Sequence, residues 1–125
     1  MPPPEIEEFA KILVEQVRDQ AVSSCEINLR PEARSLTAQR WHRASVVKNA
    51  QTETLIPDCV DAALFFLLNA IDQGVLRLQF TAADGKVVDL TSAGDGELAG
   101  WYSGEGGWRS RFSAERIADQ PGRTT

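Results

Sequence analysis

The sequence predicts a small α+β domain in which three N-terminal helices pack on a three-stranded antiparallel sheet, with short helical turns near the C-terminus. Before Gly74, apolar residues recur every three or four positions, as on one face of a helix; after it they recur every two, as in a strand. The chain has 125 residues, of which 42% are hydrophobic and 25% charged. These values are typical of one soluble domain. We expect residues 1–120 to form that domain and residues 121–125 to fray.

The first predicted helix starts near Glu5. Pro4 suits a first helical position, where its missing N–H would have no partner anyway, and the glutamates after it complement the helix dipole. The end of this helix stays open, because apolar and polar residues alternate over 25–30 as they would in a strand, and Pro31 stops either element. One apolar face runs along the helix: Ile6, Phe9, Ala10, Leu13, Val17, Ala21 and Cys25.

Two further helices are predicted. Residues 32–48 form a weaker pattern with arginines on its polar side, and residues 49–54 are polar enough to be a connector. Pro57 then suits the start of a third helix. Since Phe65 and Phe66 make that helix apolar nearly all round, we expect it to be the central and most buried one. Gly74 is expected to end it in the left-handed conformation.

Three strands are predicted after Gly74. Residues 76–81 and 87–90 alternate in polarity, and Asp84-Gly85 between them favours an antiparallel hairpin. The glycine-rich section 91–107 contains a short predicted helix over 97–103. Residues 108–112 alternate again and predict the third strand, after which Ser113 is expected to cap a helical turn through Ile117.

Charge is unevenly distributed along this acidic chain. Its net charge is −5, from 13 basic and 18 acidic residues. Residues 30–48 hold five basic residues against one acidic residue, a net charge of +4, whereas residues 1–29 carry −4. The start of the chain has neither a basic segment nor an apolar stretch, and the longest apolar run is Ala62–Leu68. We therefore expect a cytoplasmic protein without a membrane span.

Catalytic, metal and cofactor sites find little support in the sequence. Cys25 and Cys59 fall on apolar faces, and His42, the single histidine, falls on a polar one, so a Cys-His pair is not favoured. The histidine and two distant cysteines do not make a zinc site. The glycines after residue 91 lack the parallel βαβ unit of a nucleotide site. We expect no cofactor and no metal.

Two groups of residues are candidate binding surfaces. The first combines cations with an aromatic side chain in the second helix, as nucleic-acid grooves do, but it also suits an acidic protein surface, or a helix that is solvated or paired with the acidic first helix. The second holds aromatic residues among glycines, which suits either an interface or a core plug, with arginines that could hold an anionic group. The first group consists of Arg34, Arg40, Trp41 and Arg43. The second group consists of Trp101, Tyr102, Trp108, Arg109 and Arg111.

These features favour a small non-catalytic interaction protein over an enzyme. It would bind a protein partner or a second copy of itself, as a homodimeric adaptor or as an inhibitor or immunity-type partner of a basic protein. The first alternative is a small-ligand or enzyme site for an anionic compound between the helices and the sheet. The second alternative is nucleic-acid binding through the basic second helix, which the acidic net charge disfavours.

Overall fold

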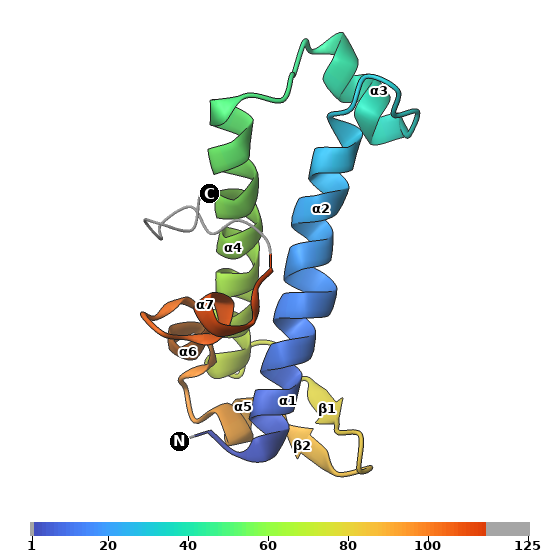
Figure 1. Cartoon of the computed structure of the whole chain (residues 1–125). Helices are drawn as coiled ribbons and strands as arrows, with labels where there is room; N and C mark the ends of the chain where they lie inside the picture. The colour runs from blue at the N-terminus through green and yellow to red at the C-terminus, as the bar shows by residue number, and fades with distance from the viewer. Residues whose placement is uncertain (1, 115–125) are drawn as a thin grey trace.

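In the computed structural model, which describes residues 2–114, two long antiparallel helical rods run side by side and a short helix caps one end of the pair (Figure 1). The first rod is continuous through three elements: α1 (Pro4–Ile12), the π-helix η1 (Leu13–Arg18) and α2 (Asp19–Asn28). The short helix is α3 (Leu36–Arg43) and the second rod is α4 (Ala50–Asp72). The β-hairpin and three short helices gather at the other end (Figure 1).

The predicted first helix is confirmed, and it continues to Asn28, so residues 25–28 are helical and not a strand. Pro4 stands at its first position with Glu5 and Glu7 in the first turn. The π-helical turn in the middle widens the spiral by one residue and shifts the faces that follow it. Arg18 and Asp19, where this turn meets α2, are both buried.

The second and third helices differ in length from the prediction. Helix α3 is shorter than residues 32–48, because Ser35 caps it by accepting a hydrogen bond from the Ala38 N–H. Helix α4 begins at Ala50, so the predicted connector over 49–54 and the predicted start at Pro57 are wrong. Asn49 and Thr52 form a reciprocal capping box that satisfies the free N–H groups there. Pro57 lies inside the helix, at the cost of one backbone hydrogen bond.

Helix α4 is not the most buried element, which corrects the sequence prediction. Its side toward the first rod and the short helices is buried at Asp61, Leu64, Leu68 and Ile71. Its opposite side is open, and the Phe66 side chain is 66% exposed. Two rods side by side cover each other on one side only, so an all-round apolar helix keeps an uncovered face.

The end of α4 agrees with the prediction. Gly74 adopts φ +73°, and its N–H donates to the Ile71 carbonyl while the Val75 N–H donates to the Ala70 carbonyl. This pair of bonds is a Schellman motif, which satisfies carbonyls that the last helical turn leaves free. Glycine is favoured at this position because, having no Cβ, it adopts the left-handed conformation without a steric clash.

The sheet has two strands, β1 (Gln79–Thr81) and β2 (Val87–Asp89), paired antiparallel with Phe80 opposite Val88. The hairpin prediction is confirmed, and Gly85 in its turn has φ +89°. The third strand is wrong, because residues 108–112 form α7 (Trp108–Phe112). Helix α5 (Leu90–Gly94) begins at Leu90, directly after β2, so β2 is only three residues long.

The core lies where α1, η1 and the lower part of α4 meet the short helices, including α6 (Leu98–Ser103), which confirms the predicted short helix. The hairpin is an appendage beside α1, where the Phe80 ring packs edge-on to Phe9 with centroids 5.6 Å apart. The helices therefore do not rest on a sheet. The predicted turn through Ile117 and the tail over 121–125 lie outside the described residues. The buried core consists of Ile6, Ala10, Leu13, Val14, Leu64, Leu68, Ile71, Leu90, Leu98, Ala99, Tyr102 and Trp108.

Candidate functional site

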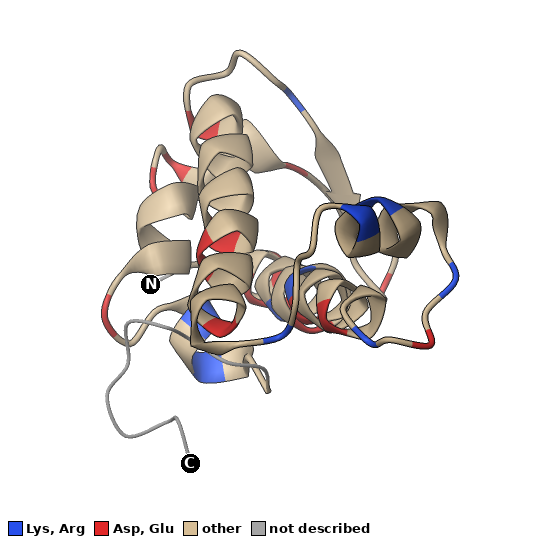
Figure 2. Ribbon diagram, turned by 90° about the horizontal axis from the view of Figure 1, so that it is seen from above, with Lys and Arg blue, Asp and Glu red and all other residues tan. Residues whose placement is uncertain are grey.

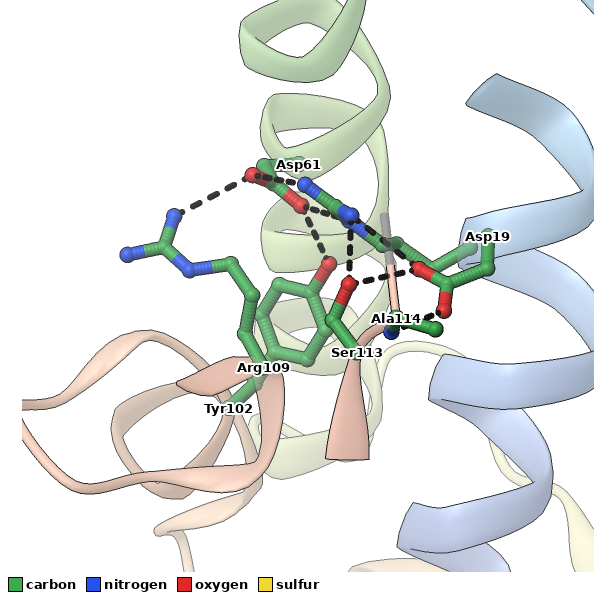
Figure 3. Close-up of polar contacts among 7 residues, drawn as sticks. Asp19, Asp61, Tyr102, Arg109, Ser113 and Ala114 are labelled. Carbon is green, nitrogen blue, oxygen red and sulfur yellow. Dashed lines mark hydrogen bonds and ion pairs between the residues drawn. The ribbon is translucent and has the colours of Figure 1, made fainter. Parts of the chain in front are cut away.

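A buried polar cluster, centred on the Asp61 carboxylate of α4, joins the two rods to the C-terminal helices (Figure 3). Arg18 donates to it twice, from Nε to Oδ1 at 3.0 Å and from Nη2 to Oδ2 at 3.3 Å. The Tyr102 hydroxyl donates to Oδ1 at 2.6 Å, and Arg109 Nη1 donates to Oδ2 at 3.2 Å. One carboxylate thus binds groups from η1, α6 and α7 at once.

A second carboxylate completes this cluster. Asp19 Oδ1 accepts from Arg18 Nη1 at 3.1 Å and from the Ser113 hydroxyl at 2.8 Å, and its Oδ2 accepts from the Ala114 N–H at 2.8 Å. Two guanidinium groups, those of Arg18 and Arg109, therefore balance the carboxylates of Asp19 and Asp61. A buried charge is tolerated when it is paired and hydrogen-bonded in this way.

The cluster raises the pKa of two of its members, Arg18 and Tyr102. Burial by itself lowers the pKa of Arg18, but its hydrogen bond to Asp61, the charge of Asp61 and the contact with Asp19 outweigh burial and raise that pKa. Burial, followed by the hydrogen bond to Asp61, raises the pKa of the Tyr102 hydroxyl far above its ordinary value. A charged arginine and a neutral tyrosine both suit a structural role, because neither is poised to exchange a proton near pH 7.

The aromatic candidates divide between core and surface. Trp108 is 1% exposed and Tyr102 is fully buried, whereas Trp101 is half-buried. The rings of Trp101 and Trp108 pack with centroids 6.0 Å apart. A shallow groove of about 710 Å³ lies beside them, between the N-terminal turn and the glycines of the α6–α7 loop. Of the two alternatives that the sequence left open for Trp108, the structure therefore agrees with packing in the core and not with an interface.

The arginines beside these aromatic residues already have carboxylate partners. Arg111 donates to both oxygens of Glu7, from Nη1 at 3.0 Å and from Nη2 at 3.2 Å. Arg109 is held by Asp61 inside the polar cluster. An anionic ligand would have to displace a carboxylate from each guanidinium group, so the geometry does not favour the predicted anionic site.

The remaining candidates lie on α3 or, for Arg34, just before it, at the other end of the rods from α6 and α7 (Figure 1). The predicted site residues thus form two separate groups. Arg34, Arg40 and Arg43 are exposed and Trp41 is half-buried. In the part of the chain that the structure describes, no ion pair joins these arginines to the acidic first helix. Figure 2 shows the basic residues on and beside α3.

The uncovered side of α4 is a surface that the sequence did not predict. We call it the α4 face, and it contains Leu55, Cys59, Ala62, Ala63 and Phe66, all exposed. The helix has 23 residues, and an 18-residue window of it has a mean hydropathy of 1.6. By length and composition alone it is long enough to cross a membrane. The sequence prediction of no membrane span required an uninterrupted run of apolar residues. That criterion is stricter than the mean hydropathy of a helix, which tolerates a few polar residues.

The thiols and the histidine do not form one site. Cys25 is half-buried in α2 and Cys59 is exposed on α4, while His42 Nε2 lies 3.2 Å from the Arg30 carbonyl oxygen. Burial, followed by the charges of Cys59 and Glu26, raises the pKa of the Cys25 thiol. Within residues 2–114, no group of three or more histidine, cysteine, aspartate or glutamate residues is placed to hold a metal ion.

Tyr102 and Arg109 of the polar cluster were among the predicted site residues, but Arg18, Asp19 and Asp61 were not, and Asp61 was missed because the third helix was predicted to start too late. With a helix starting at Ala50, Asp61 falls on the same face as Pro57, Leu64 and Leu68, which would have marked it as a buried carboxylate. The signal was the Asn49-x-x-Thr52 capping pattern. Neither a protein-family model, nor a curated protein, nor a solved structure matches this chain.

Proposed function

We propose that this chain is a non-catalytic interaction protein that binds a second copy of itself through the α4 face. The observation that supports the proposal is the exposed Phe66 ring, which lies among other apolar side chains on one side of a long helix. Covering a phenylalanine side chain fully contributes roughly 1.5–3 kcal/mol. A contiguous apolar surface of this kind, on a chain with many charged residues elsewhere, is typical of an interface.

The chemistry of the α4 face suits a second pair of helical rods. Two antiparallel helices that pack only on each other leave their outer sides open, and pairing two such units gives a four-helix arrangement. Ala62 and Ala63 stand at the middle of the face, and small residues there let two helix axes approach to about 8–10 Å.

The polar cluster supports a non-catalytic role. Its carboxylates, its phenol and the Arg18 guanidinium are buried, Arg109 is partly buried, and these groups bind one another, so their hydrogen bonds join η1, α2, α4, α6 and α7. Catalytic groups need access to a substrate and a pKa near the working pH. This arrangement stabilises the fold instead.

The α4 face is tested by the mass of the protein in solution. We expect size-exclusion chromatography with light scattering to give a dimer whose fraction rises with concentration, and Phe66→Glu to shift it to monomer. Gln20→Glu, which adds the same charge at an exposed position of α2, should leave the dimer intact. Circular dichroism checks that both variants fold. A wild-type monomer at every concentration would overturn the proposal.

A second candidate function, nucleic-acid binding, rests on the exposed arginines of α3. The net charge of −5 opposes it, since phosphate contacts need local cations and little competing repulsion. A fluorescence titration with duplex DNA or RNA at low salt separates the candidates. Binding that weakens steeply as salt is added would support the nucleic-acid function, and no binding at low salt would remove it.

A further inference from the structure

The charges of this protein are separated along its long axis. The end that carries α3, residues 30–48, has five basic residues against one acidic residue, a net charge of +4. We call it the basic tip. The opposite end, residues 2–12 and 72–112, has five basic residues against nine acidic residues, a net charge of −4. We call it the acidic end. Figure 1 places these two ends at opposite ends of the rods.

The cations of the basic tip are available for a partner. Arg40 and Arg43 are exposed on α3 and Lys48 is exposed beyond it. Among the ion pairs of the described residues, none includes these three side chains. At the acidic end, Asp84, Asp95 and other carboxylates are likewise exposed.

We infer that two copies pair antiparallel along α4, so that the basic tip of each lies against the acidic end of the other. This inference rests on the proposed self-association and adds its orientation. The α4 face extends from Leu55 to Phe66, and half-buried Ala70 continues it. The middle of that stretch falls between Ala62 and Ala63, which places a two-fold axis there. An isologous pair of this kind is the commonest form of homodimer.

Size and charge both favour the antiparallel orientation. From Leu55 to Ala70 the helix is roughly 24 Å long and about 10 Å wide, which is well short of the ~800 Å² per partner of a standard interface. Contacts at the ends must therefore contribute. Antiparallel pairing places the +4 end of each copy nearest the −4 end of the other, whereas parallel pairing places two +4 ends side by side.

Single-cysteine variants report the orientation directly. In a Cys25→Ser/Cys59→Ser chain, Ala63→Cys should form an intermolecular disulfide on mild oxidation, because position 63 lies beside the proposed axis. At about 1.5 Å per residue, the two copies of position 55 are about 22 Å apart along an antiparallel pair, beyond the ~7 Å between Cα atoms that a disulfide spans. Leu55→Cys should therefore stay reduced. Ala62→Cys is the second variant in case Ala63→Cys perturbs packing.

Salt gives an independent readout of the same orientation. We expect the dimer dissociation constant of the wild-type chain to rise about tenfold between roughly 20 mM and roughly 500 mM NaCl, since salt screens attraction between the ends. Arg40→Glu combined with Arg43→Glu should weaken the dimer at low salt and flatten its salt dependence. Gln39→Glu, an exposed polar position on the same helix, adds one charge without removing a cation and should have a smaller effect.

The possible outcomes separate the two proposals. A dimer that tightens with salt and cross-links through Leu55→Cys is parallel, which overturns this inference and keeps the proposed function. A dimer that cross-links at neither Ala62→Cys nor Ala63→Cys overturns it as well. A monomer that co-sediments with phosphatidylcholine vesicles overturns both, because the α4 face would then bind lipid.

Discussion

Arg18 and Asp61 form a two-point ion pair across the two rods, 43 positions apart in sequence, with N–O distances of 3.0 and 3.3 Å. Arg18 has no exposed surface, so its charge depends on this carboxylate and on Asp19. The pair also fixes the relative position of η1 and α4, because a planar guanidinium group accepts a carboxylate in few orientations. The short C-terminal helices add Tyr102 and Arg109 to the same carboxylate.

Asp61→Asn should destabilise the protein by about 3–5 kcal/mol, because it leaves the buried Arg18 and the partly buried Arg109 without their shared counter-charge. Chemical denaturation followed by circular dichroism measures this free energy of unfolding. Asp58→Asn, an exposed position one turn earlier in α4, should change it by less than about 0.5 kcal/mol. Equal effects of the two substitutions would mean that the cluster does not stabilise the fold.

Alkaline pH should unfold the protein through Tyr102. Its pKa in the folded chain is raised above the ordinary value of about 10, so the unfolded state loses that proton first. The contribution to stability is complete below about pH 10 and is lost as the pH rises toward the folded pKa. Tyr102 is the single tyrosine, so ultraviolet absorbance reports its ionisation alone.

In this titration, tyrosinate should appear together with the loss of helical circular dichroism. Tyr102→Phe should be less stable at neutral pH, for want of the hydrogen bond to Asp61, and should lose less stability between about pH 9 and pH 11. A tyrosine that ionises near pH 10 in the folded chain would show that its hydroxyl is not buried against Asp61.

Trp108→Ala should cost about 3–5 kcal/mol, as large aromatic truncations in a core do. Trp108 is buried against Phe9 and Trp101, with ring centroids 6.1 Å and 6.0 Å away. Val87→Ala, at an exposed hairpin position, is the control and should cost less than about 1 kcal/mol. If Trp108→Ala left the stability unchanged but altered self-association, Trp108 would be an interface residue and not a core residue.

At protein concentrations low enough to keep the chain monomeric, where the α4 face is uncovered, the two thiols should react at different rates with iodoacetamide at neutral pH. Cys59 is exposed, whereas burial raises the pKa of Cys25 and lowers its thiolate fraction. We expect Cys59 to react about fivefold faster or more, and the rate at Cys25 to increase with pH. Mass spectrometry of tryptic peptides separates the two sites. Faster reaction at Cys25 would indicate an activated thiol that the geometry does not show.

Asn49→Ala tests where α4 begins. Losing the N-cap oxygen should destabilise the protein by about 0.5–2 kcal/mol, since the Thr52 N–H loses its acceptor. Ser24→Ala, an exposed position inside α2, is the matched control and should be neutral or slightly stabilising. Chemical denaturation measures both. A neutral Asn49→Ala would favour a helix that starts closer to Pro57.

Local patterns predicted the elements whose causes are local. The helical period from Ile6 onward, the Gly74 end of α4 and the Asp84-Gly85 turn all follow from backbone geometry and from side chains a few residues apart. The start of α4 also had a local signal, the capping pattern of Asn49 and Thr52. The preference of proline for the first position of a helix favoured a start at Pro57 instead.

By itself the sequence determined that this chain forms long helices first and a hairpin later, and that cations gather over residues 30–48. Only the tertiary structure decided that residues 108–112 are helical, that Phe66 is exposed, and that Arg18, Asp19 and Asp61 share one cluster. The physical reason is that alternation and periodicity describe which residues share a side of an element. Which side is covered depends on the neighbour that packs there, and that neighbour can come from any distance along the chain.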